Sequence, residues 1–183
     1  MKRREFLQAM GGSAAVLFIP LPQVEQILKQ GVQINLKCLG NTPGPTYLDG
    51  RTANSTVGLA PKTAKPYSGT KWLVASMQGD LLRLQCKGSV PGNRWLDGRT
   101  GNGSVGLAPN TKEPFTGTLW RVVYLDRNNP NIIALECQGK VNGPRWLDGR
   151  TANGSVGLAP KTDPPYTGTH WEVMKAGVII DEG

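Results

Sequence analysis

The sequence repeats itself three times, and this repetition limits the possible folds more than any other feature. The tetrapeptide Leu-Asp-Gly-Arg stands at 48–51, 96–99 and 147–150, and a Gly-Thr-x-Trp element closes each copy. The aspartates are 48 and 51 residues apart, and the cysteine and tryptophan of each copy keep the same two intervals. Several markers with shared spacing predict three tandem copies of one structural unit.

Within each copy the local pattern indicates short β-strands. Leu36 and Cys38 alternate with polar neighbours, and Trp120 and Val122 do the same at the end of a copy. An Asn-Gly dipeptide at 102–103, which has a counterpart in the third copy, is typical of a tight hairpin. We therefore expect four short strands in each copy.

The predicted fold is all-β, a β-trefoil of three four-stranded repeats of about 50 residues each. A small propeller, which is also built from four-stranded units, is the alternative, but three copies of this length favour a closed barrel. We place the domain at 32–181, with repeats at 32–79, 80–130 and 131–181, behind a separate segment at 1–31. A chain of 183 residues with 38% apolar residues suffices for one such core.

The N-terminal segment has the pattern of an address for export. It resembles the twin-arginine signal of bacterial exported proteins, with the pair Arg3 and Arg4 followed by Phe6 and Leu7. The apolar stretch at 14–19 is shorter than the ~20 residues of a membrane span. The resemblance implies an extracytoplasmic protein, periplasmic or secreted, with this segment either removed or kept as a membrane tether. A cytosolic tail is the alternative.

Each repeat also resembles the repeat of ricin-B-type lectins, in which Leu-Asp, Asn-Gly, Val-x-Leu and a final tryptophan follow in this order. In that family the aspartate binds a sugar hydroxyl, and the resemblance assigns this role to Asp49, Asp97 and Asp148. The family closes its repeat with Gln-x-Trp, where this chain has Thr-x-Trp. The aromatic residue of the third strand and the disulfides within repeats are missing here.

The candidate sugar-binding residues are polar or aromatic side chains repeated around these aspartates. Carboxylates and amides suit sugar hydroxyls, because each hydroxyl both donates and accepts, and an aromatic ring offers a stacking face. The structural alternative is that the aspartates fix turns or pair with the arginine two residues on, and that the aromatic rings close the barrel mouth. The candidates are Asp49, Asn54, Tyr67, Asp97, Asn102, Phe115, Asp148, Asn153 and Tyr166.

The repeated cysteines and tryptophans are predicted to be core residues. Cys38, Cys86 and Cys137 lie in alternating apolar strands, where a thiol is usually a small buried hydrophobe. Three thiols that converge on an axis could hold a soft metal, but their spacing is not that of a zinc site. We expect no metal and no cofactor.

Neither catalysis nor nucleic-acid binding is expected. The net charge is +8, but the basic residues are spread singly beyond residue 4, whereas nucleic-acid binding favours a clustered patch. The sequence shows no nucleophile–base pair, no paired carboxylates and no phosphate-binding glycine loop. The chain is therefore predicted not to be an enzyme.

The predicted function is that of a non-catalytic, lectin-like carbohydrate-binding module with up to three equivalent sites, whose partner is a glycan or cell-wall polysaccharide. One alternative is a structural or accessory subunit of a larger extracytoplasmic or membrane-associated assembly, which it joins through residues 1–30. The other is a trefoil-type protease inhibitor, for which only the loop at 126–131 is distinctive. Membrane contact is expected only through the N-terminal segment.

Overall fold

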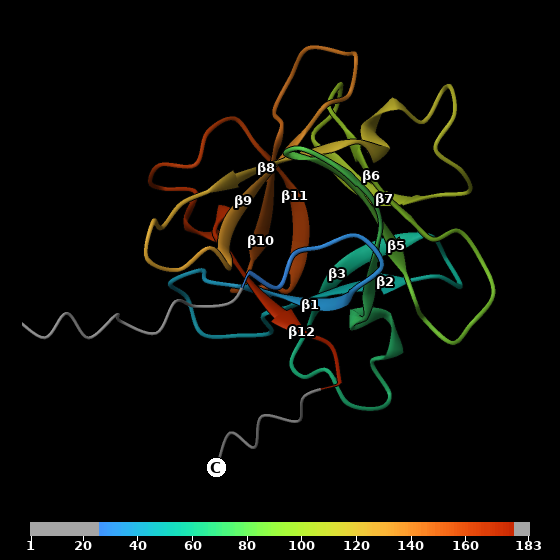
Figure 1. The fold of residues 1–183 in the computed structure, drawn as a ribbon, viewed down its shortest axis with the longest axis horizontal. Coiled ribbons are helices and arrows are strands. Elements are labelled where there is room, and N and C mark those ends of the chain that lie inside the picture. The colour runs from blue at the N-terminus through green and yellow to red at the C-terminus, as the bar shows by residue number, and fades with distance from the viewer. Residues whose placement is uncertain (1–25, 178–183) are drawn as a thin grey trace, which may run out of the picture.

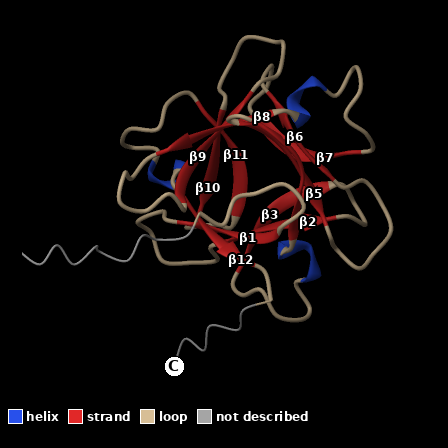
Figure 2. Ribbon diagram, viewed as in Figure 1, coloured by secondary structure: helices blue, strands red, loops and turns tan. Residues whose placement is uncertain are grey.

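The computed structural model describes residues 26–177, and β-strands dominate this part of the chain. Three short 3-10 helices, blue in Figure 2, lie well apart around the edge of the strands. The strands are β1 (Gln33–Cys38), β2 (Tyr47–Arg51), β3 (Thr56–Ala60), β4 (Trp72–Gln78), β5 (Leu81–Cys86), β6 (Trp95–Arg99), β7 (Ser104–Ala108), β8 (Trp120–Tyr124), β9 (Ile132–Cys137), β10 (Trp146–Arg150), β11 (Ser155–Ala159) and β12 (Trp171–Lys175). The helices are η1 (Ser68–Thr70), η2 (Thr116–Thr118) and η3 (Thr167–Thr169).

Antiparallel ladders join ten of these strands into a closed ring. The order is β2-β1-β12-β9-β8-β5-β6-β7-β11-β3, and β3 pairs back with β2. The two remaining strands pair onto the ring, β4 with β1 and β5, and β10 with β9 and β11. Figure 1 shows the strands wound around a common interior. The described residues therefore form a closed ten-stranded barrel with two additional strands.

This architecture corrects the fold expected from the sequence. The all-β class and the twelve strands are confirmed, but the closed ten-stranded barrel contradicts the β-trefoil of three four-stranded repeats. Extensive ladders cross the boundaries of the sequence repeats, because β1 pairs with β12, β4 with β5 and β8 with β9. The repeat of the sequence therefore does not divide the sheet into separate units.

The core contains the tryptophan that closes each sequence repeat, as predicted. Trp72, Trp120 and Trp171 are fully buried. Each indole Nε1 donates a hydrogen bond, 2.9 to 3.0 Å long, to the leucine carbonyl of the Leu-Asp-Gly-Arg element in its own repeat. A buried indole N–H requires such a partner, so these bonds fix the rings against the strands that carry the aspartates.

The three cysteines are free and buried, which confirms that prediction. Each thiol donates to the glycine carbonyl of an Asp-Gly-Arg element in another repeat, at 3.3 Å. Burial raises the pKa of Cys38 and of Cys137 to about 11. These thiols are therefore packing groups with little thiolate at neutral pH.

We expect iodoacetamide to leave the native protein unlabelled at pH 8, because the reactive thiolate is both scarce and inaccessible. After denaturation in urea, intact-mass spectrometry should show three added groups. Rapid labelling of the native protein, with the barrel still folded by circular dichroism, would contradict this expectation.

The described part of the N-terminal segment packs on the barrel. Leu28 is 1% exposed and belongs to the core cluster. The backbone N–H of Ile27 donates to Oδ1 of Asn131 at 2.9 Å, and that of Gly31 donates to the Val74 carbonyl at 2.8 Å. Within residues 26–177, no helix is long and apolar enough to cross a membrane.

Candidate functional site

The aspartate of each sequence repeat lies in the middle of a strand and is covered by a 3-10 helix. Asp49 is in β2, and η1 packs directly against it. This close approach depends on Gly69, because a Cβ there would stand 2.1 Å from the Gly50 carbonyl oxygen and 2.6 Å from Asp49 Oδ1. Gly117 and Gly168 occupy the same position in the other repeats, so all three aspartates are buried in the same way.

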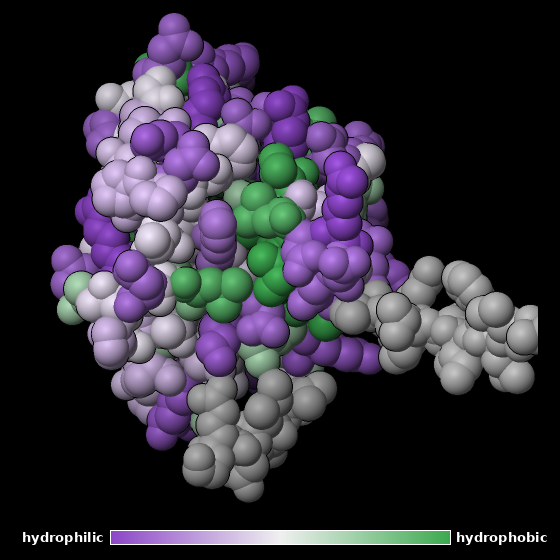
Figure 3. All heavy atoms as spheres, turned by 90° about the vertical axis from the view of Figure 1, so that its left-hand side faces the viewer, coloured by the Kyte–Doolittle hydropathy of each residue, from purple (hydrophilic) through white to green (hydrophobic). Residues whose placement is uncertain are grey.

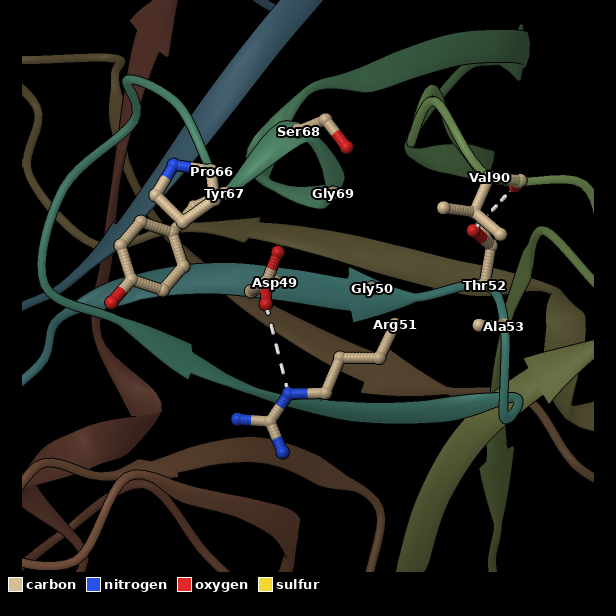
Figure 4. Close-up of a pocket in the computed structure, with 10 residues that line it drawn as sticks. All are labelled: Asp49, Gly50, Arg51, Thr52, Ala53, Pro66, Tyr67, Ser68, Gly69 and Val90. Carbon is tan, nitrogen blue, oxygen red and sulfur yellow. Dashed lines mark hydrogen bonds and ion pairs between the residues drawn. The ribbon is translucent and has the colours of Figure 1, made fainter.

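A hollow of about 150 Å³ opens beside Asp49. Figure 4 shows the Asp49 carboxylate between the ring of Tyr67 and the side chain of Arg51. Thr52 and Val90 form the opposite side, where the Thr52 hydroxyl donates to the Val90 carbonyl at 2.6 Å. Because Val90 belongs to the next sequence repeat, the hollow is built from two repeats.

The electrostatic arrangement is the same in all three repeats. The side chains of Asp49, Asp97 and Asp148 are only 10%, 6% and 9% exposed, whereas the arginine two residues on is more than half exposed. The arginine Nε lies 3.7 Å from the aspartate Oδ2 each time. Desolvation raises the pKa of each carboxyl, and the neighbouring arginine offsets part of this effect.

Among the described residues, Asp49 forms its ion pair with Arg51. An ionised carboxylate has about four acceptor positions, so most of its capacity is unused here. A buried carboxylate with unused acceptor positions can accept a hydrogen bond from a hydroxyl donor that enters the hollow.

The guanidinium of each of these arginines lies on a glycine of the neighbouring strand. A Cβ at Gly58 would stand 2.8 Å from Arg51 Nη2, and Gly106 and Gly157 meet their arginines at 3.1 and 3.2 Å. Gly58 pairs with Asp49 across the β2–β3 hairpin. The glycine of the repeated Val-Gly-Leu element therefore leaves room for the ion pair, a role that the sequence analysis did not assign.

The three asparagine candidates do not join the aspartates. Asn54, Asn102 and Asn153 lie in the hairpin turns, where each Oδ1 accepts the backbone N–H and the hydroxyl of the residue two positions on. The hydroxyl bonds are 2.7 to 2.8 Å long. None of the three lines either described hollow, so the structure gives them a turn-forming role.

The aromatic candidates do lie near the aspartates. Tyr67 lines the hollow at Asp49, and Tyr166 lines a second hollow, of about 300 Å³, at Asp148. Phe115 precedes η2 in the position that the tyrosines hold before η1 and η3. In the first and third repeats a tyrosine and an aspartate therefore line the same hollow. Their role in sugar binding stays a prediction.

No family model matches the chain, and no curated protein matches it. Among solved structures, the chain is similar to a salivary protein from Culex quiquefasciatus of the Cysteine and Tryptophan-Rich family, at 14% identity and a TM-score of 0.55, over 83% of this chain and 98% of that one. It is also similar to the GlcNAcα1-4Gal releasing endo-β-galactosidase from Clostridium perfringens, at 12% identity and a TM-score of 0.59. That match covers 79% of this chain and 32% of the enzyme. At these identities the likeness concerns the fold alone.

These comparisons correct two resemblances drawn from the sequence. Neither a ricin-B-type lectin family nor a twin-arginine signal is matched, so the lectin and export assignments are unsupported. The signal residues Arg3, Arg4, Phe6 and Leu7 lie outside the described residues. The lectin assignment rested on short elements such as Leu-Asp and Val-x-Leu, and the structure explains the second of these by strand packing and by the glycine that accommodates Arg51.

Proposed function

We propose that this protein is a non-catalytic glycan-binding module whose sites are the hollows beside Asp49 and Asp148 and the equivalent position beside Asp97. The observation that carries the proposal is the nearly buried carboxylate in each repeat, whose ion-pair partner is a single arginine at 3.7 Å. A sugar hydroxyl can donate to such a carboxylate and accept from the adjacent guanidinium. At Asp49 and Asp148 a tyrosine ring in the wall of the hollow adds a face for the sugar ring.

Single sites of this kind are expected to bind weakly. The hollows are open to solvent, so each new hydrogen bond replaces one to water and gains only about 1 kcal/mol. Three sites on one barrel raise the effective concentration for a long glycan. An insoluble polysaccharide should therefore be retained far better than a free monosaccharide.

The test replaces all three aspartates by asparagine, which keeps their shape but removes the carboxylate. We expect retention on insoluble polysaccharides to fall by about tenfold or more, since each site loses a charged acceptor.

The same variant also makes a prediction about stability. Because burial raises the pKa of the three carboxyls, the wild-type fold loses stability as pH rises from about 3.8 through their folded pKa values. The variant lacks this penalty, so its urea midpoint at pH 7 should equal or exceed that of wild type.

The matched control replaces three exposed aspartates by asparagine, and so makes the same change in net charge. These are Asp80, Asp126 and Asp163. This variant should retain wild-type binding. The proposal fails if wild type binds no member of a panel of glycans, or if the hollow variant folds and binds as wild type does.

A structural or accessory subunit is the second candidate. Figure 3 shows an apolar strip on one face of the barrel, flanked by polar residues, and such strips often mark protein contacts. Leu28 also ties the beginning of the described chain firmly to the core. In this proposal the residues before 26 attach the barrel to an extracytoplasmic or membrane-associated assembly. Deleting residues 1–25 should then release the barrel from the membrane fraction while glycan binding is unchanged.

A further inference from the structure

We propose that the sites of the three repeats are not equivalent: the hollow at Asp148 is the principal site, and Asn41 and Thr42 select its ligand. This inference rests on the proposed glycan-binding function. The ligand assigned to the site is a sugar unit that carries a carbonyl or carboxylate substituent.

The size and the lining of the hollows differ. The hollow at Asp148 has about 300 Å³, against about 150 Å³ at Asp49. Val90 lines the smaller hollow, whereas Asn41 and Thr42 line the larger one. The first repeat therefore presents an amide and a hydroxyl where the second presents a valine side chain.

A second difference lies in how the lining loops are held. In the second repeat the Arg94 guanidinium donates to three carbonyls of the lining loop. Nη1 donates to Cys86 at 3.2 Å and to Gly88 at 2.8 Å, and Nη2 donates to Val90 at 3.1 Å. Arg145 holds the loop of the third repeat in the same way. The first repeat has Thr46 at this position, so its loop lacks the arginine clamp.

Each loop is also bonded to the 3-10 helix across from it, through Ser89 and Ser68 in the second repeat and through Lys140 and Thr116 in the third. In the first repeat the side chain that makes this contact is an amide. The hydroxyl of Thr167, beside Tyr166, donates to Asn41 Oδ1 at 3.0 Å. This bond occupies the amide oxygen, and within the described residues the Nδ2 group of Asn41 has no hydrogen-bond partner. Nδ2 can therefore donate to a ligand that is already bound to Asp148.

The donors and acceptors around this hollow define the ligand. Asp148 requires a donor, which a ring hydroxyl supplies, while Asn41 Nδ2 and the Arg150 guanidinium both require acceptors. A substituent with a carbonyl or carboxylate oxygen meets the second requirement better than a hydroxyl, because it offers lone pairs without a proton to place. An N-acetylated amino sugar and a uronic acid both carry this chemistry, and the doubled volume leaves room for the group.

The experiment compares Asp49→Asn, Asp97→Asn and Asp148→Asn by titration calorimetry with three oligosaccharides: N-acetylglucosamine oligomers, oligouronates and unsubstituted glucose oligomers. Asp148→Asn should weaken binding by about tenfold, as expected for loss of a hydrogen bond to a charged group, and the other two variants by less than about twofold. Whichever binds wild type more tightly, the N-acetylglucosamine oligomers or the oligouronates, identifies the substituent that the site takes.

A repeat swap tests the selecting residues. Asn41→Ser with Thr42→Val copies the second repeat into the first and should remove the preference for the substituted oligomer over glucose oligomers. The reverse swap, Ser89→Asn with Val90→Thr, disturbs a loop to the same extent but adds the selecting residues at the Asp49 hollow, so it should preserve or strengthen the preference. Equal losses in the three aspartate variants, or an unchanged preference after the first swap, overturn this inference alone. If wild type binds no oligosaccharide at all, the proposed function itself is overturned.

Discussion

Replacing Trp120 by alanine is expected to lower the free energy of unfolding by about 4 kcal/mol. The indole is fully buried, so its removal leaves a large cavity that the closed barrel cannot readily fill. The change also removes the donor to the Leu96 carbonyl, 3.0 Å away in wild type, and an unpaired buried carbonyl adds about 1–3 kcal/mol. Urea unfolding followed by circular dichroism measures the loss.

Two variants distinguish the causes. Trp120→Phe keeps an aromatic ring but loses the hydrogen bond, so it should show a smaller loss than the alanine variant. Trp72→Ala should match Trp120→Ala to within about 1 kcal/mol, because both indoles have the same burial and the same bond to a leucine carbonyl. A loss below about 1 kcal/mol for Trp120→Ala would show that the indole does not support the barrel.

The sequence predicted the strands better than their arrangement. Alternation around Leu36 and Cys38, and the hairpin turn at Asn102, are local signals, and the structure confirms strands and turns at these places. Pairing between distant strands leaves no such signal in a single sequence. Leu36 opposite Val173 joins the two ends of the described chain, and this β1–β12 ladder is one of the links of the ring.

The candidate site was also predicted in part. Tyr67 and Tyr166 line the same hollows as Asp49 and Asp148. Asp49, however, lies within a strand instead of a turn, and its neighbour Gly50 faces the core against Cys86 and Trp72. The hollow is completed by the next repeat, as Val90 shows. A side chain from another repeat could be recognised only once the loops were placed in space.

The other functional alternatives remain predictions. The inhibitor hypothesis depends on the loop at 126–131, which is held by bonds from the Asn128 and Asn131 backbone N–H groups to side chains within the loop. Asn131 also receives the Ile27 N–H, so part of this loop anchors the beginning of the described chain. Extracytoplasmic location and the absence of catalysis likewise remain predictions.

Replacing Gly168 by alanine should lower the free energy of unfolding by about 3 kcal/mol or more, through overpacking against main chain. The new Cβ would stand 2.0 Å from the Gly149 carbonyl oxygen and 2.7 Å from Asp148 Oδ1. The Gly149 carbonyl is main chain and cannot rotate away as a side chain can, so η3 must lift from β10. Because this contact also buries Asp148, the variant should lose glycan binding at that hollow even at temperatures where the barrel stays folded.

Gly79→Ala is the matched control for this change. Gly79 has a φ of +60°, and a Cβ there would meet nothing within 4 Å, so the control carries only the backbone strain of about 1–2 kcal/mol. Chemical denaturation of both variants, with calorimetric titration of the better-binding oligosaccharide, separates packing from strain. If Gly168→Ala is no less stable than Gly79→Ala, η3 does not press on β10 as described. The aspartate would then owe its burial to other contacts.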